Sequence, residues 1–233
     1  MAYPYNLLLA SLLTVFVFFW MVNENNKTAV VFQALTGENT VAITVDDGPD
    51  PVYTLQILEI LQRYEVPATF FVVGMQVERY PDILRREAAL GNEVANHSYT
   101  HNNLHTMNLQ EVTRELSRTN GIIRQYTGKN VTWFRPPRGA YNRMVTEAAN
   151  QCGLKTVLWT VVVENRKNKT PEDMARRVVQ TVKPGGIILL HDSRLDRTKT
   201  VQALPLIIEG LREKGYNFVT VSELLNGNKG ESV

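Results

Sequence analysis

Short apolar runs alternate with helix-like segments along most of the chain, and this alternation constrains the fold more than any other feature. The runs at 41–45, 68–73 and 187–190 are rich in β-branched and aromatic residues, as buried strands are. Segments such as 52–64 and 109–126 carry apolar residues three or four positions apart, as helices do. Strands joined through helices run parallel, and parallel strands buried on both faces read as continuous apolar runs. We therefore predict an α/β fold with one domain, a distorted (β/α) barrel of about seven parallel strands; an open doubly wound sheet is the alternative.

The rest of the chain follows the same pattern, and we find no internal repeat. The predicted strands cover 41–45, 68–73, 93–96, 131–134, 156–161, 187–190 and 218–221, and the predicted helices cover 52–64, 81–90, 109–126, 143–151, 171–182 and 201–214. A length of 233 residues, 44% of them hydrophobic, is enough for one sizeable core.

The N-terminus carries a separate hydrophobic segment. Residues 7–22 are apolar apart from Ser11 and Thr14, and as a helix they would span about 24 Å, close to the ~30 Å of a bilayer core. A signal peptide is the alternative, but no Lys or Arg precedes the run and no clear Ala-x-Ala site follows it. We predict an N-terminal membrane anchor or signal-like segment at 1–22.

Three further segments complete the predicted organisation. Residues 23–40 are polar and mixed, so we expect a tether; 41–226 form the folded domain; and 227–233, rich in Gly, Asn and Lys, form a disordered tail. The 25 basic and 23 acidic residues nearly balance, which gives no reason to expect a nucleic-acid partner. Cys152 is the only cysteine and excludes an intramolecular disulfide. We expect a monomer.

Polar residues follow four of the predicted strands at the point where each strand ends. They are Asp46 and Asp47, His97 to His101, Arg135, and His191. Because the C-terminal ends of parallel strands meet on one face, these side chains should lie close together. Taken alone, each has an ordinary explanation: an Asp-rich turn, a solvated polar loop, a surface arginine and a satisfied histidine at a strand end.

The charges and spacings of these residues favour a metal site. Asp46 and Asp47 stand side by side after a buried strand, where a divalent cation would offset their repulsion and lost hydration. His97 and His101 are four residues apart, so on a helical turn both imidazoles can reach one metal. Two imidazoles and one carboxylate leave a position open for water, as in hydrolytic zinc sites. His105 is expected to be exposed or to enter a helix.

Arg135 is the candidate partner for one of these carboxylates. It precedes two prolines, which stiffen the backbone around it. A rigid arginine near two aspartates can pair with one and keep it ionised.

Four segments resemble known motifs. Thr44-Val45-Asp46-Asp47-Gly48-Pro49, His97-Ser98-Tyr99-Thr100-His101, Arg135-Pro136-Pro137-Arg138-Gly139 and Leu189-Leu190-His191 resemble, in order, the first, second, third and fifth motifs of the polysaccharide deacetylases. This is the NodB-homology group, carbohydrate esterase family 4. The similarity runs from about residue 39 to about residue 225, and it implies the same distorted barrel of about seven strands.

The resemblance implies a role for each metal-site and base residue. Asp47, His97 and His101 would bind a divalent ion, most often zinc, with Co²⁺ as a second candidate. Asp46 would be the general base toward a metal-activated water that attacks the acetamide, and Arg135 would keep Asp46 ionised.

The resemblance also implies an acid and a substrate pocket. His191 would protonate the departing sugar amine. The backbone N–H of Arg138, where the family often has Tyr, would help to bind the tetrahedral oxyanion. Leu189 would line the pocket for the acetyl methyl, and Trp159 belongs to the same substrate-facing set.

The fourth motif departs from the family. The segment 159–166 has Val or Asn where acids are expected and Arg166 near the position of a tryptophan. The missing aspartate would normally raise the pKa of the acid histidine, so His191 should be less protonated unless Glu164 or Asp192 substitutes. We therefore expect intact metal binding with weakened activity or an altered substrate range.

These observations lead to three functional hypotheses. The first is a metal-dependent hydrolase that removes N-acetyl groups from an extracellular polysaccharide, peptidoglycan before chitin-type oligomers, at the cell membrane with the catalytic domain outside a bacterial cell. The second is a catalytically weakened relative that binds wall glycan as a surface protein. The third is an amidase or esterase for a non-sugar acyl group.

Overall fold

The computed structural model describes residues 29–164 and 170–226, and the strand that ends in Asp46 lies at the centre of its sheet. This strand, β2 (Thr40–Asp46), is buried along its whole length and pairs with β3, β8 and β9, all parallel. The other strands are β1 (Val30–Val31), β3 (Ala68–Val72), β4 (Glu93–Asn96), β5 (Trp133–Phe134), β6 (Lys155–Val157), β7 (Val161–Val162), β8 (Ile187–His191) and β9 (Asn217–Phe218). In the described residues they form one sheet in the order β1-β6-β5-β4-β3-β2-β8-β7, with β9 beside β2.

The sheet is curled into an incomplete barrel. β6 lies near one end of the order and β7 lies at the other, yet only residues 158–160 separate them in the chain. The backbone of this segment donates to Val31 on one side and to Ile187 on the other. The chain itself therefore links the two ends of the sheet, and the predicted distorted barrel in a single domain is confirmed.

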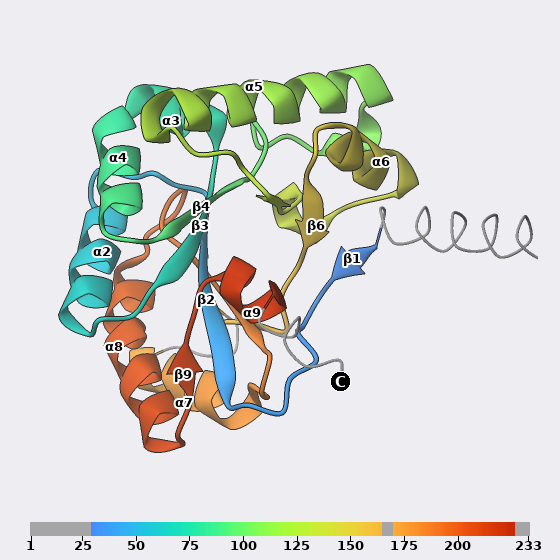
Figure 1. The fold of residues 1–233 in the computed structure, drawn as a ribbon. Helices are drawn as coiled ribbons and strands as arrows, with labels where there is room; N and C mark the ends of the chain where they lie inside the picture. Colours follow the sequence, from blue (N-terminus) through green and yellow to red (C-terminus); the bar gives the residue numbers. More distant parts are fainter. Residues whose placement is uncertain (1–28, 165–169, 227–233) are drawn as a thin grey trace, which may run out of the picture.

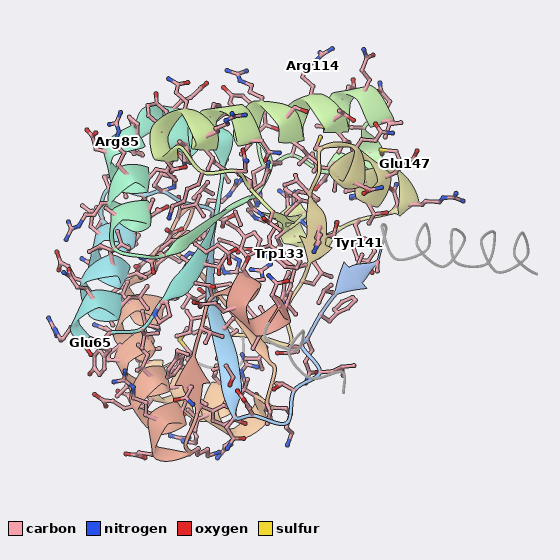
Figure 2. The ribbon with its side chains drawn as sticks, viewed as in Figure 1. Glu65, Arg85, Arg114, Trp133, Tyr141 and Glu147 are labelled. Carbon is pink, nitrogen blue, oxygen red and sulfur yellow. The ribbon has the colours of Figure 1, made fainter. Side chains whose placement is uncertain are left out.

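Helices cover the outside of this sheet (Figure 1). They are α2 (Tyr53–Arg63), α3 (Gly74–Arg79), α4 (Pro81–Ala89), α5 (Leu109–Thr127), α6 (Arg143–Gln151), α7 (Pro171–Thr181) and α8 (Thr198–Glu213), with short 3₁₀ turns at Leu104–Thr106 and Pro137–Gly139. The short α9 (Val221–Asn226) instead packs against the inner face of the sheet. Exposed side chains such as Arg85 and Arg114 extend outward from α4 and α5, whereas Trp133 is buried (Figure 2).

Successive residues of β2 pack into two different apolar clusters, one on each face of the sheet. Val41, Ile43 and Val45 join the large apolar cluster that includes α2, α7 and α8. Ala42 joins a smaller cluster with Phe71 and Trp133. Because side chains alternate across a strand, Asp46 lies on the same face of β2 as Ala42.

Several predicted elements differ from the observed ones. Residues 30–34, predicted as tether, belong to the domain, since β1 pairs with β6 and Ala34 N–H donates to Gly185. The predicted strand 156–161 is split into β6 and β7, because its backbone changes partners at 158–160. The predicted strand 218–221 ends at Phe218.

Helix α9 follows that strand, and its start carries a signal that can be read in the sequence. Glu223 accepts hydrogen bonds from the N–H and hydroxyl of Thr220, and Glu223 N–H donates back to the Thr220 hydroxyl. This Thr-x-x-Glu pattern is a capping box. The six-residue α3 is the other helix outside the predicted set.

No helix within 29–164 or 170–226 has the length and apolar character needed to cross a membrane. The predicted anchor at 1–22 and the predicted tail at 227–233 lie outside the described residues.

Candidate active site

The backbone turns sharply between Asp46 and Asp47, and the two carboxylates meet different partners. Asp46 is the last residue of β2, and Asp47 has a positive φ of 88°. Asp46 Oδ1 accepts a hydrogen bond of 2.7 Å from Arg135 Nη1. Asp47 Oδ1 instead lies 3.0 Å from His101 Nε2 and 3.7 Å from His97 Nε2.

Asp47, His97 and His101 form a compact set of potential metal ligands. They are 5%, 2% and 6% exposed, and one ligand atom from each lies within 4.8 Å of the others. Asp47 Oδ1 is buried without a hydrogen bond to any described residue. Burial alone would raise the pKa of Asp47, but the imidazoles around it lower that pKa to about 2. A buried, ionised oxygen facing two ring nitrogens fits a divalent cation, and the N₂O set suits zinc.

The two histidines are held in different ways. Nδ1 of His97 donates to the Arg135 carbonyl at 2.7 Å, which leaves Nε2 unprotonated and free to act as a ligand. Burial lowers the pKa of His97, which also favours the neutral ring. His97 and His101 do not share a helical turn as the spacing predicted, because Ser98 and His101 adopt left-handed backbone conformations (φ 66° and 59°) and the segment is a loop. His105 is exposed, as expected.

Arg135 is fully buried, and all three nitrogens of its guanidinium donate hydrogen bonds. Its guanidinium also donates to the Thr44 hydroxyl at 2.8 Å and to the Leu158 carbonyl at 3.0 Å, and it lies 4.0 Å from the centre of the Phe71 ring. The predicted pairing with an aspartate is therefore present, and the partner is Asp46.

His191 has the carboxylate partner that the departure in the fourth motif put in question. Glu164 Oε2 lies 3.2 Å from His191 Nδ1, and Glu164 Oε1 accepts the His191 backbone N–H at 3.0 Å. Burial alone would lower the pKa of His191, but Glu164 raises it above its usual value. Thr200 donates to Glu164 and fixes its orientation. Asn165 and Arg166 lie outside the described residues.

Asp192, the other substitute considered from the sequence, does not take this role. Its carboxyl accepts a hydrogen bond from Thr54 and packs against Gly48, where a Cβ atom would lie 2.3 Å from Asp192 Oδ2. Burial raises the pKa of Asp192 to about 7. Gly48 is therefore required for close packing behind the Asp47 turn.

Eight of the nine predicted site residues meet around one cavity of about 110 Å³, and Arg135 supports it from behind. The cavity is lined by Asp46, Asp47, His97, His101, Arg138, Trp159, Leu189, His191 and Arg197. Arg138 has a left-handed backbone (φ 60°), and its N–H makes no hydrogen bond to another described residue. Trp159 packs on Gly139, where a Cβ atom would lie 2.7 Å from the indole.

Arg197 is the lining residue that sequence reasoning missed. It is 8% exposed, its Nη2 lies 3.7 Å from Asp47 Oδ2, and its Nη1 lies 3.7 Å from Glu164 Oε1. Nε donates to the Ser193 carbonyl, which aims the guanidinium between the two carboxylates. It lies in the loop after β8, outside every quoted motif, so no local pattern indicated it.

Comparison with known proteins places this geometry in a family. A family model described as polysaccharide deacetylase matches residues 33–157. A peptidoglycan-N-acetylglucosamine deacetylase of Bacillus cereus is 37% identical over 198 residues, covering 84% of this chain and 92% of that protein.

Solved structures agree. A peptidoglycan N-acetylglucosamine deacetylase in complex with an N-hydroxybenzamide superposes with a TM-score of 0.81 at 31% identity, covering 88% of this chain and 96% of that one. A pseudoenzyme of family CE4 from Bacillus anthracis superposes with a TM-score of 0.79 at 32% identity, covering 84% of this chain and 69% of that one. A family 4 acetyl xylan esterase from Clostridium thermocellum in complex with a cobalt ion superposes with a TM-score of 0.74 at 36% identity, covering 79% of this chain and 89% of that one. The chain therefore belongs to the polysaccharide deacetylase family, carbohydrate esterase family 4.

Proposed function

We propose that this protein is a metal-dependent hydrolase that removes N-acetyl groups from an extracellular polysaccharide, with peptidoglycan as the first candidate substrate and chitin-type oligomers as the second. The observation that carries the proposal is the convergence of the Asp47, His97 and His101 ligand set with Asp46 and His191 on one cavity. The Bacillus cereus relative is a peptidoglycan-N-acetylglucosamine deacetylase, which supports the choice of peptidoglycan.

Asp46 has the position of a general base. Its Oδ2 lies 3.7 Å from His97 Nε2, beside the ligand set, while its Oδ1 is held by Arg135. When bound, a divalent cation supplies Lewis-acid polarisation of the acyl carbonyl and makes water a better nucleophile at neutral pH. The free oxygen of Asp46 takes the proton from the attacking water.

His191 lies where a general acid is needed, and its partner favours the protonated ring. It lines the same cavity, and the carboxylate of Glu164 favours its charged form. A protonated His191 donates its proton to the departing amine, which would otherwise leave as a poor anion.

Three further residues shape the acyl pocket. The N–H of Arg138 supplies a donor for the oxyanion, because its left-handed backbone leaves that group without a partner among the described residues. Leu189 and Trp159 give the cavity apolar walls that suit the acetyl methyl.

We assign the cation as Zn²⁺, with Co²⁺ as a functional substitute. The N₂O ligand set supports zinc, and the cobalt complex of the Clostridium thermocellum relative supports substitution. The apolar segment 7–22 supports attachment to the cell membrane. The proposed extracellular substrate, and not this segment, is the reason to propose that the catalytic domain lies outside. The glycan-binding hypothesis loses its main support, since Glu164 supplies the carboxylate that the fourth motif was expected to lack.

Acetate release tests the proposal. The purified full chain is incubated with peptidoglycan and with chitooligosaccharide, each with Zn²⁺ or Co²⁺. We expect acetate from at least one substrate, and we expect Asp46→Asn to reduce the rate by about 10²- to 10⁴-fold. The exposed Asp82→Asn is the matched control and should act like the wild type. Equal rates for Asp46→Asn and the wild type, or no acetate under any of these conditions, would overturn the proposal.

A further inference from the structure

The loop between the two histidine ligands has an unusual backbone. Ser98 and His101 are left-handed, a conformation that costs non-glycine residues energy and persists only when the surroundings impose it. Such a loop cannot form helical hydrogen bonds. Its N–H groups therefore need acceptors from elsewhere.

Side chains supply those acceptors, and one from α5 supplies most. Oε2 of Glu115 accepts the N–H of Tyr99 at 3.0 Å, the N–H of Thr100 at 2.8 Å and the Thr100 hydroxyl at 3.0 Å. At the two ends of the loop, Ser98 N–H donates to the Asn96 side chain and His101 N–H donates to the Ser98 hydroxyl.

His101 depends on this loop more than His97 does. The ring of His97 is oriented by the Arg135 carbonyl. Nδ1 of His101 is buried and has no hydrogen-bond partner within the described residues. The backbone that carries His101 is therefore the main determinant of where its Nε2 lies, 3.0 Å from Asp47 Oδ1.

The side chain of Tyr99, in the middle of this loop, has separate contacts with α3 and α5. Tyr99 is held by a hydrogen bond of 2.8 Å to Glu78 and by the guanidinium of Arg118, 3.6 Å from its ring centre. Arg118 also pairs with Glu78. Arg114, by contrast, points outward from α5 (Figure 2).

We infer that Glu115 is a positioning residue that holds the loop between His97 and His101 in its metal-binding conformation. The inference rests on the metal site of the proposed function. Loss of the carboxylate leaves two backbone N–H groups without their acceptor, so the loop relaxes and the ligands lose their preorganised spacing.

The variants separate this role from a general effect on folding. Glu115→Ala should weaken Zn²⁺ binding by about 10- to 100-fold, the usual effect of removing a group that orients metal ligands. Glu115→Gln keeps the length and one acceptor oxygen, so its affinity should stay within about threefold of the wild type. Glu115→Asp keeps the charge, but its shorter side chain places the carboxylate farther from the loop, so its Zn²⁺ affinity should lie between those of the Ala and Gln variants. Glu147→Ala removes an exposed glutamate from α6 and is the matched control.

Metal affinity is the readout. Each metal-free full-length variant is titrated with Zn²⁺ against a chromophoric chelator, and the urea midpoint of the metal-free protein is measured in parallel. The inference is supported by weakened binding in Glu115→Ala, or in Glu115→Asp if the alanine variant does not fold, together with rescue in Glu115→Gln. Wild-type affinity in a folded Glu115→Ala, or equal losses in Gln and Ala, would overturn it. Failure of the wild type to bind Zn²⁺ would instead overturn the metal site itself.

Discussion

Asp46 and Asp47 are identical neighbours in the sequence, and one backbone torsion gives them different chemistry. The strand ends at Asp46, which therefore stays on the inner face of β2 with Arg135. The positive φ of Asp47 turns its carboxylate toward the two imidazoles, where its pKa falls to about 2. A left-handed aspartate is uncommon, and strain of this kind concentrates at functional sites.

At the same scale, Glu164 sets the pH range over which His191 is charged. Because the carboxylate raises the pKa of His191, the acid stays protonated to higher pH, and activity is lost as pH rises through that pKa. Glu164→Gln removes the effect. We expect the basic limb of the kcat/KM profile to move to lower pH and the rate at pH 8 to fall about 3- to 30-fold.

Deacetylation rates from pH 5 to 10 check this prediction, with Glu147→Gln as the control for loss of an exposed carboxyl group. An unchanged basic limb in Glu164→Gln would mean that Glu164 does not govern the charge of the acid.

The sequence predicted the identities of the site residues better than their local conformations. Asp46, Asp47, His97, His101 and His191 follow strands, and strand ends of a parallel sheet converge by topology. The helical turn expected for His97 and His101 did not form, because the Glu115 carboxylate of α5 stabilises a loop instead. Contacts of that kind, like those of Arg197, join residues far apart in the chain.

Among the elements, α5 is the longest helix that the structure describes, and the sequence predicted it to within one residue because both of its ends carry local signals. Asn108 and Glu111 form a capping box at its start, and Gly128 ends it with a left-handed backbone (φ 69°). Both signals are local. The helix that holds the metal-site loop is thus specified mainly by its own sequence.

Two glycines of this helical segment allow a matched test. A Cβ atom at Gly121 or at Gly128 would meet nothing within 4 Å, so the two positions differ mainly in backbone conformation. Gly121→Ala should stabilise the protein by about 0.5–1 kcal/mol, since alanine favours the helix interior. Gly128→Ala should destabilise it by about 1 kcal/mol, because a Cβ opposes the positive φ. Urea unfolding of both variants checks the prediction, and shifts of the same sign would contradict it.

The elements that the sequence misjudged are those defined by long-range pairing. Between β6 and β7, the N–H of Leu158 donates to the Val31 carbonyl, whereas the N–H of Thr160 donates to the Ile187 carbonyl. Both halves are apolar and β-branched, so the pattern read as one strand. A hydrophobic pattern predicts which residues are buried, but it does not predict which neighbouring strand their backbone pairs with.

Across the whole molecule, Arg135 joins parts that are distant in the sequence. Its guanidinium bonds to Asp46 on the central strand and to the carbonyls of Val157 and Leu158, where the sheet closes on itself. Its own carbonyl orients His97. The Arg135 side chain therefore stabilises both the candidate active site and the closure of the barrel.

Arg135→Met should destabilise the protein by about 3–5 kcal/mol, because it leaves Asp46 buried and unpaired. Adding Asp46→Asn should recover part of this loss, and the remainder reflects the closure carbonyls. Urea unfolding of the single and double variants measures both. The exposed Arg176→Met should change stability by less than about 0.5 kcal/mol. A double variant no more stable than Arg135→Met would contradict the pairing argument.

The double duty of Arg135 bears on how relatives of this protein are judged. A descendant that had abandoned hydrolysis would still need the arginine to keep its barrel shut, so retention of Arg135 is weak evidence for a working enzyme. His191 has no comparable structural role, because its side chain pairs with Glu164 at the site. The presence or loss of His191 is therefore the better guide to which members of the family still turn over substrate.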